Sequence, residues 1–396
     1  MAAHTIVAMG GDGIGPVVLA EARRVLEASG FEARWIDAEI GWSCWVRDGD
    51  PLPRRTIDLL AEHRVGFLGA ITSKPKNDAE AELSPMLRGR GIAYRSPLLS
   101  LRQHFDLYVS FRPSRTIPGN PTNFVRRRTD GSIEEPDLDI AVFRENTEGL
   151  YTGVEWSDPP RAVRDALAAH PRFAPYRDVA GPDLAIAVRV ITRRACRRLL
   201  DAAFRHAESE GARTVTIAEK PNVLRDTSGL VLEVARDVQR AWPDLTLRSV
   251  NIDALLLELA RRPEDFEVIV ATNLFGDLVS DAAAGLTGGL GFACSANLGD
   301  DVAIFEPVHG SAPRHASFDP PIVNPCAAIL AGALLLEHLG ERERAACVRD
   351  AVAAVVAEGA VRTYDMMRLR AGGDVLSRGA ASTRAMADAV IARLRP

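Results

Sequence analysis

Apolar residues along this chain follow two patterns that alternate from one end to the other. Short runs rich in β-branched residues predict strands at 4–9, 31–36, 65–71, 107–112, 184–191, 214–222 and 268–270. Longer segments with helical spacing predict a first helix ending near Ala28, a last helix near the C-terminus, and others at 54–63, 97–104, 192–210, 228–242, 324–340 and 343–357. Strands that alternate with helices indicate an α/β protein with a mostly parallel sheet.

Two aspartates follow the strand predicted at 268–270. Residues 273–276 are expected to form a turn, and Asp277 to open a helix that runs through Ala284. Asp277 and Asp281 are four residues apart, so a helix would project both carboxylates from one face. Like charges repel there, whereas a hard divalent cation takes oxygen ligands. The alternative is that Asp277 is an N-cap and Asp281 a solvated surface residue.

Composition excludes several classes of protein. The chain has 396 residues, of which 47% are hydrophobic, enough for a large core. Its formal charge of −5 gives no sign of a nucleic-acid or membrane-surface partner. The five cysteines are scattered without a CxxC pair, and the N-terminus lacks a secretory signal pattern. We therefore expect reduced thiols and a cytoplasmic protein.

Lysine is rare in this chain. Lys and Arg total 48, but only three of these are lysines: Lys74, Lys76 and Lys220. Lysine is a compact point charge that can lose its proton, which arginine cannot do. The three are therefore candidates for functional roles. The alternative is that they have no special role and are simply the few lysines in an arginine-rich chain.

Three arginines stand at the edges of apolar segments. Arg102, Arg112 and Arg144 form a plausible anion clamp, because the planar guanidinium group grips carboxylates through two hydrogen bonds. Ordinary surface arginines are the alternative in so arginine-rich a chain. The glycines of 10–15 do not match the spacing of a dinucleotide-binding loop, and we interpret them as a tight turn before Pro16. Residues 151–181 are rich in Pro, Arg and Asp, which indicates an arm, insertion or loop.

Taken in order, the motifs resemble one family. They are GDGIGP, LRQHFDLY…RP, FRENTEGLYTGVE, NLFGDLVSD, GGLGFACSANLGD, FEPVHGSAP and NPCAAIL. This set resembles the metal-dependent β-decarboxylating dehydrogenases, which include isocitrate, homoisocitrate, isopropylmalate and tartrate dehydrogenases.

The resemblance implies a two-domain α/β fold that is not a Rossmann fold. It places a large domain at 1–107 and 288–396 and a small domain at 108–287, with a dimer clasp near 150–185. It also implies a homodimer whose active sites lie between the domains and are completed by the partner.

The resemblance also implies roles for the polar residues. Arg102, Arg112 and Arg144 would hold the malate carboxylates, and Asp277 and Asp281 would bind Mg²⁺ or Mn²⁺ together with a residue equivalent to Asp253 from the second protomer. Lys220 would take the hydroxyl proton and Tyr151 would protonate the enol carbon. Some family members are regulatory subunits without turnover. Such chains usually lose the metal-binding aspartate, the tyrosine or the lysine, all of which are present here.

The cofactor motif resembles that of NADP-dependent members. NAD-dependent members typically carry Asp after HGSAP, whereas this chain has Arg314 and His315, followed in its tail by Tyr364 and Arg368. The two arginines can grip a 2′-phosphate. The other cofactor contacts that the resemblance implies are Thr72, Glu306, His309, Gly310, Ser311, Ala312 and Asn324.

The substrate's distal group is less clearly encoded. Ser96 matches NADP-dependent isocitrate dehydrogenases, but Leu98 and Leu68 stand where those enzymes carry Asn and Lys. We hypothesise that Lys74, together with Ser96, binds an anionic distal group, which would be a carboxylate or the phosphonate of 3-(phosphonomethyl)malate. Leu98 by itself would suit the apolar pocket of an isopropylmalate dehydrogenase, and homoisocitrate is a further alternative.

Overall fold

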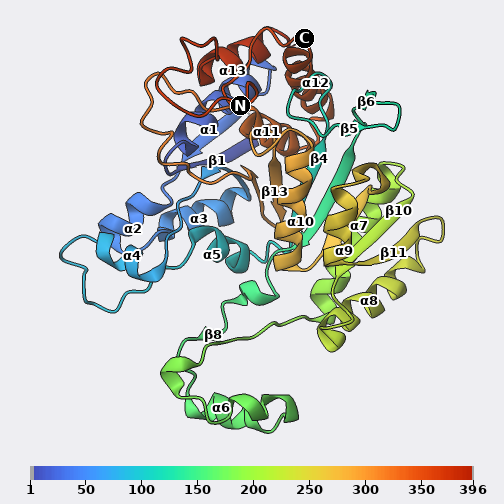
Figure 1. The fold of residues 1–396 in the computed structure, drawn as a ribbon. Coiled ribbons are helices and arrows are strands. Elements are labelled where there is room, and N and C mark those ends of the chain that lie inside the picture. Colours follow the sequence, from blue (N-terminus) through green and yellow to red (C-terminus); the bar gives the residue numbers. More distant parts are fainter. Residues whose placement is uncertain (1–3, 395–396) are drawn as a thin grey trace.

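The computed structural model describes residues 4–394, without the side chains of Lys76 and Asn77. Within that range the centre of the molecule is a ten-stranded sheet in the order β11-β10-β12-β7-β4-β13-β14-β3-β1-β2 (Figure 1). Its strands are β1 (His4–Gly11), β2 (Ala33–Asp37), β3 (Val65–Ala70), β4 (Val109–Arg115), β7 (Asp139–Glu145), β10 (Thr214–Glu219), β11 (Thr246–Asn251), β12 (Val268–Ala271), β13 (Cys294–Leu298) and β14 (Ala303–Pro307). β4 and β13 run antiparallel to their neighbours, and the other adjacent strands pair in parallel. The α/β prediction is confirmed.

Strands from the two ends of the chain and strands from its middle occupy separate halves of this sheet. β1, β2, β3, β13 and β14 form one half, and the strands between residues 109 and 271 form the other. The halves meet at the antiparallel β4–β13 pair, where Val109 lies opposite Leu298. This junction coincides with the expected boundaries near 107 and 288, although the division into two domains stays a prediction.

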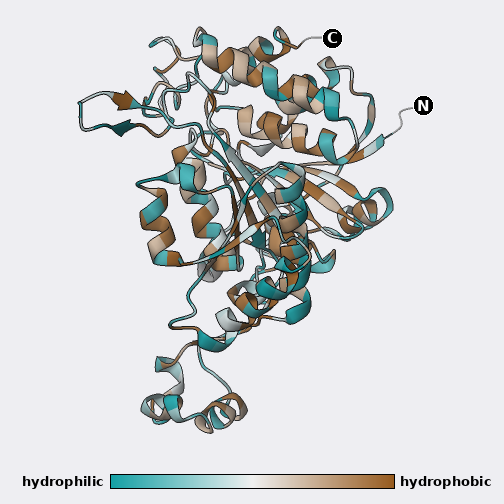
Figure 2. Cartoon of the chain, turned by 90° about the vertical axis from the view of Figure 1, so that its right-hand side faces the viewer, coloured by the Kyte–Doolittle hydropathy of each residue, from teal (hydrophilic) through white to brown (hydrophobic). Residues whose placement is uncertain are grey.

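Helices cover both faces of each half. They are α1 (Gly15–Ala28), α2 (Trp42–Asp48), α3 (Arg54–His63), α4 (Lys76–Glu82), α5 (Pro97–His104), α7 (Arg193–Ser209), α8 (Arg225–Gln239), α9 (Ile252–Leu259), α10 (Asn273–Leu286), α11 (Cys326–His338), α12 (Arg342–Glu358) and α13 (Thr383–Ile391). In β1, Ile6 packs with α1 and α11, whereas its neighbour Val7 packs with α3 and α5. The helices α7 and α8 cover one face of the middle half and α9 and α10 the other. Apolar residues accordingly occur both on strands of the central sheet and on the helices that flank it (Figure 2).

The helix that carries the two aspartates begins earlier than predicted. Residues 273–276 are not a turn, because α10 starts at Asn273 and the Gly276 amide donates to the Thr272 carbonyl at 2.7 Å. Gly276 suits this first turn because a Cβ atom there would lie 2.7 Å from the Arg144 side chain. The helix therefore passes directly over β7, a contact that local sequence patterns do not reveal.

The strand predicted at 184–191 is also shorter than expected. Within it, β9 (Ile186–Ala187) pairs with β8 (Glu155–Trp156) in a two-stranded ribbon that is separate from the main sheet. The ribbon begins an arm that projects from the body and ends in α6 (Arg161–Ala168), as both views show (Figures 1 and 2). The predicted arm is therefore present, and its role as a dimer clasp stays a prediction. In residues 4–394 no helix has the length and apolar character needed to cross a membrane.

Candidate active site

Three buried arginines converge at the junction of the two halves. Arg112 on β4 and Arg144 on β7 lie on adjacent antiparallel strands, where Arg112 lies opposite Val142. Val142 is two positions from Arg144, so the two arginine side chains share one face of the sheet. Arg102 comes from the last turn of α5. Their exposed fractions are 7%, 1% and 4% respectively, so the surface-arginine alternative is wrong.

Arg112 and Arg144 are more deeply buried than the aspartates that face them. Desolvation lowers the pKa of Arg144 to about 9, with a further contribution from Arg112 and Arg102. Burial likewise lowers the pKa of Arg102, and the negative charge of Glu306 partly offsets this decrease. The buried Arg112 Nε atom has no hydrogen-bond partner. Crowded, incompletely paired guanidinium groups favour the binding of an anion that supplies acceptor oxygens.

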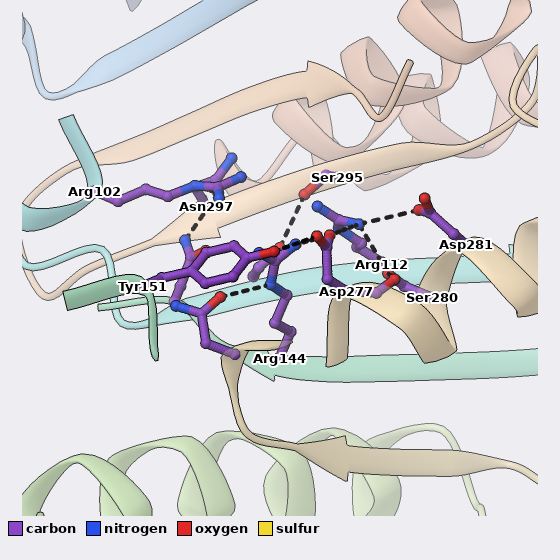
Figure 3. Close-up of polar contacts among 12 residues, drawn as sticks. Arg102, Arg112, Arg144, Tyr151, Asp277, Ser280, Asp281, Ser295 and Asn297 are labelled. Atoms are coloured by element: carbon purple, nitrogen blue, oxygen red, sulfur yellow. Dashed lines mark hydrogen bonds and ion pairs between the residues drawn. The ribbon is translucent and has the colours of Figure 1, made fainter. Parts of the chain in front are cut away.

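Asp277 lies at the centre of these contacts (Figure 3). Its Oδ1 atom forms an ion pair with Arg144 and accepts from Arg112 Nη1 at 3.3 Å. Its Oδ2 atom accepts the Tyr151 hydroxyl at 2.8 Å. Burial raises the pKa of Asp277, but the two arginines outweigh burial and lower it overall. Asp277 is therefore a carboxylate at neutral pH, placed beside the tyrosine that we expect to donate a proton.

Asp281 follows one turn later in α10. Arg112 Nη1 lies 3.5 Å from its Oδ1 atom and also donates to Ser280 Oγ at 2.8 Å. Burial raises the pKa of Asp281, and Arg112 opposes that rise. Two carboxylates on one helix face fit a hard cation by their donor chemistry. In the described residues no group of three or more His, Cys, Asp and Glu side chains is arranged to hold a metal.

Lys220 and Asp253 form a separate pair. Lys220 follows β10, and its Nζ atom makes a short ion pair with Asp253 Oδ1 in the first turn of α9. The Asp253 side chain is 68% exposed, and Lys220 lowers the pKa of its carboxyl. The pair is accessible from outside the protomer, as a contribution to a neighbouring active site would require.

Several polar residues of the site were not predicted. Asn297 on β13 is fully buried, accepts from Arg102 Nε at 3.0 Å and from Asn146 Nδ2 at 2.9 Å, and donates to Glu306 at 2.7 Å. Asn273 accepts from Arg144 Nε at 3.0 Å. An asparagine inside an apolar strand is a signal that could have marked Asn297, because buried amides need partners.

A cavity of about 130 Å³ opens beside the arginines. The residues that line it include Ser96, Leu98, Arg102, Arg112, Glu306 and His309. Lys74 lies outside this lining, where its Nζ atom pairs with Glu82 Oε1 at 2.5 Å and lies 4.8 Å from the centre of the Trp42 ring. The structure thus brings Ser96 and Leu98 to the arginines and holds Lys74 on a neighbouring surface.

The predicted cofactor loops meet at the end of β3. Thr72 and Ser311 hydroxyls lie 2.5 Å apart, and the Ile14 amide donates to the Ser311 carbonyl at 2.9 Å. The GDGIGP turn therefore supports the HGSAP loop. His309, Gly310 and Ala312 lie in this loop, whereas Glu306 pairs with Arg102 at 3.2 Å. The buried His309 Nε2 atom has no partner, which leaves a polar atom to receive a ligand.

A basic surface lies beyond this loop. The His315 ring stacks on Tyr364 with centroids 5.8 Å apart, although the two are distant in sequence. Arg314 and Arg368 are exposed, and Arg368 donates to the Pro121 carbonyl at 2.8 Å. Asn324 Nδ2 donates to Asp365 at 3.0 Å, which joins the same two segments.

The fold and the site together describe an α/β protein whose central sheet places buried arginines beside two carboxylates of one helix. Comparison with known proteins identifies the family. The isocitrate/isopropylmalate dehydrogenase family model matches residues 5–390. The chain is 39% identical to isocitrate/homoisocitrate dehydrogenase of Thermus thermophilus, covering 99% of both chains. It is 37% identical to Protein DlpA of Legionella pneumophila over 98% of this chain, but spans 58% of that protein.

The fold agrees with this result. The crystal structure of isocitrate dehydrogenase from Methylococcus capsulatus superposes with a TM-score of 0.81 at 34% identity, covering 99% of this chain and 100% of the other. The chain therefore belongs to the isocitrate/isopropylmalate dehydrogenase family of decarboxylating dehydrogenases, and the family and fold predictions are confirmed. Members of this family depend on a nicotinamide cofactor and a divalent metal.

Proposed function

We propose that this protein catalyses the NADP-dependent and metal-dependent oxidative decarboxylation of a malate-type acid with an anionic distal group. The observation that carries the proposal is the cluster of three buried arginines around Asp277. In this reaction a 2-hydroxy-3-carboxy acid and NADP⁺ give a 2-oxo acid, CO₂ and NADPH. C2 loses a hydride, the hydroxyl group loses its proton, and the C3–carboxylate bond breaks as C3 takes up a proton.

The residues of the site suit these steps. Arg102, Arg112 and Arg144 bind the two malate carboxylates, which supply the acceptor oxygens that the cluster lacks. Tyr151 donates the proton to C3, and its hydrogen bond to Asp277 fixes the hydroxyl group. A lysine takes the hydroxyl proton, and Lys220 is the candidate.

Asp277 and Asp281 would hold Mg²⁺ or Mn²⁺, with Asp253 contributed by a second protomer. A bound divalent cation supplies Lewis-acid polarisation of the substrate oxygens. The exposure of the Lys220–Asp253 pair supports a site shared between two copies of the chain. The proposal includes a homodimer that is held together by the projecting arm.

Preference for NADP rests on the basic surface beside His315. Arg314 and Arg368 are free of carboxylate ion pairs within the described chain and face solvent, so a 2′-phosphate can bind between segments that the His315–Tyr364 stack already joins. A phosphate gains charge-assisted hydrogen bonds there. NAD would lack these contacts.

The distal group distinguishes the candidate substrates. Isocitrate and homoisocitrate, the substrates in the name of the Thermus thermophilus relative, both carry a distal carboxylate. Ser96 lines the cavity and can donate to that group or to the phosphonate of 3-(phosphonomethyl)malate. Lys74 contributes only after it leaves Glu82. Leu98 in the cavity wall favours isopropylmalate as the second candidate.

The test is NADPH formation with Mn²⁺ on isocitrate, homoisocitrate, 3-(phosphonomethyl)malate, isopropylmalate and tartrate, each repeated with NAD. We expect turnover with NADP and an acid whose distal group is anionic. Preference for isopropylmalate, with Lys74→Ala harmless, would overturn the anionic distal group. Absence of metal-dependent turnover with all five acids would favour a regulatory subunit instead.

A further inference from the structure

A second and larger cavity lies where the two halves of the sheet meet. Its volume is about 390 Å³, within the range of pockets that hold small organic ligands. β4 and α7 form one wall, and α11 and α12 form the other. Nothing in the proposed reaction uses it.

This cavity lies on the face of β4 opposite the candidate active site. Phe111, Pro113 and Arg115 line it, whereas the intervening Arg112 belongs to the cavity that holds the other arginines. Successive side chains of a strand point to opposite faces. A ligand here would therefore not contact the residues that bind the substrate.

The floor of the cavity is apolar. It is formed by Phe111, Phe292, Leu330, Leu334 and Ala353, with the His206 ring packed against Phe111 at 5.0 Å between ring centroids. Burial lowers the pKa of His206, so this ring is uncharged at neutral pH. Such a floor suits an aliphatic or aromatic body.

The rim carries more acidic than basic groups. Arg115 pairs with Asp139 at 2.7 Å and Glu210 at 3.4 Å, and Arg349 pairs with Glu337 at 3.1 Å. Asp350 adds another carboxylate at the rim. Asp139 lies outside the lining, so Glu210, Glu337 and Asp350 are the three carboxylates that face the two guanidinium groups, and the surplus charge of the rim is negative.

We propose that this cavity binds a small amphipathic organic cation, whose apolar body lies on the Phe111–Leu334 floor and whose ammonium group meets the rim carboxylates. Burial of the body supplies most of the affinity, and charge complementarity supplies the selection for a cation over an anion.

Titration with 4-phenylbutylamine tests the proposal, with 4-phenylbutan-1-ol and 4-phenylbutanoate as isosteric neutral and anionic probes. Binding is measured by calorimetry on the full chain. We expect saturable binding of the amine, at least tenfold weaker binding of the alcohol, and still weaker binding of the acid. Equal affinity for amine and acid, or no saturable binding by any probe, would overturn the proposal.

Variants locate the binding site. Ala353→Phe fills the cavity and should abolish binding of the amine, whereas Ala357→Phe, at an exposed position of α12 outside the lining, should not. Because Ala353→Phe can disturb folding, the double variant Glu337→Gln/Asp350→Asn serves as a second measurement. It should weaken binding of the amine and leave that of the alcohol unchanged. Amine binding that neither variant changes would place the ligand elsewhere and refute the assignment.

Discussion

At the scale of single residues, the candidate active site combines deeply buried arginines with more exposed aspartates. Arg144 is almost completely buried and pairs with Asp277. Arg112 makes longer contacts with Asp277 and Asp281, and Arg102 pairs with Glu306. Removal of water strengthens each of these interactions and makes unpaired charge costly. The proposed substrate would therefore meet guanidinium groups that are already held in place.

Replacement of Arg314 with Gln should weaken NADP selectively. A hydrogen bond to a charged group contributes about 1.5–3 kcal/mol, so KM for NADP should rise about tenfold to a hundredfold. KM for NAD should stay unchanged, because NAD has no 2′-phosphate. Steady-state kinetics with both cofactors measure this difference, and Arg370→Gln is the control at an exposed position of the tail segment that carries Arg368. An equal rise with NAD would contradict the proposed phosphate contact.

His206 should make stability sensitive to acid. Burial among Phe111 and Phe143 holds its folded-state pKa below 6.5, so the unfolded chain binds a proton more readily. The free energy of unfolding should therefore fall as pH drops below about 6.5, until the folded-state pKa is reached. His206→Phe should reduce this slope in urea unfolding between pH 7.5 and 5.5. An unchanged slope would show that other groups cause the acid sensitivity.

At the scale of elements, a buried carboxylate joins the ends of two strands to the base of the arm. Glu219, the last residue of β10, is fully buried and accepts from Ser228 Oγ at 2.5 Å and from Arg189 Nη2 at 2.9 Å. It also accepts from the amide of Thr272, which precedes α10, at 3.2 Å. The Glu219 side chain thus helps to position both Lys220, which is the next residue in the chain, and α10, which carries Asp277.

Loss of this carboxylate should be strongly destabilising. Glu219→Ala leaves Arg189 without its buried partner, and breaking such a pair costs about 3–5 kcal/mol. Glu233→Ala is the matched control, because its pair with Arg193 has side chains 58% and 52% exposed. It should cost about 0–1 kcal/mol. Thermal and urea unfolding of both variants measure the change in the free energy of unfolding. Similar decreases for the two variants would mean that burial of Glu219 has little energetic effect.

At the scale of the whole molecule, the candidate active site lies where strands from the chain ends meet strands from the chain middle. Arg102 and Glu306 belong to the terminal half, whereas Arg112, Arg144 and Asp277 belong to the middle half. Lys220 and Asp253 pair with each other at a partly exposed position. The proposed homodimer would bring the Lys220 of one copy to the Asp277 of the other.

Mixing two inactive variants tests this sharing. Lys220→Ala and Asp277→Asn should each be nearly inactive, but a mixed dimer would contain one intact site. Random reassortment should therefore restore about a quarter of wild-type activity, since half of the dimers are mixed and half of their sites are intact. Refolding or prolonged co-incubation followed by activity assay measures the recovery, with light scattering to confirm dimers. No recovery in mixtures shown to contain mixed dimers would place both residues in the same protomer's site.

Much of the fold was determined by the sequence itself. Alternating apolar runs predicted most of the helices and strands, including α5 and β12, because those elements bury faces set by local periodicity. The four-residue spacing of Asp277 and Asp281 predicted their common helical face, and the ordered motifs predicted the family. These features depend on near neighbours in the chain or on residue identity.

The tertiary structure decided the rest. The α10 start at Asn273 depends on Arg144 from β7, and the environment of Arg102 depends on Asn297, a residue 195 positions away. Lys74 pairs with Glu82 rather than entering the cavity lining, because α4 presents a carboxylate to it. Such partners are chosen by packing between distant segments. The local sequence shows which residues are able to form a charged contact, but tertiary packing determines which of these residues pair with one another.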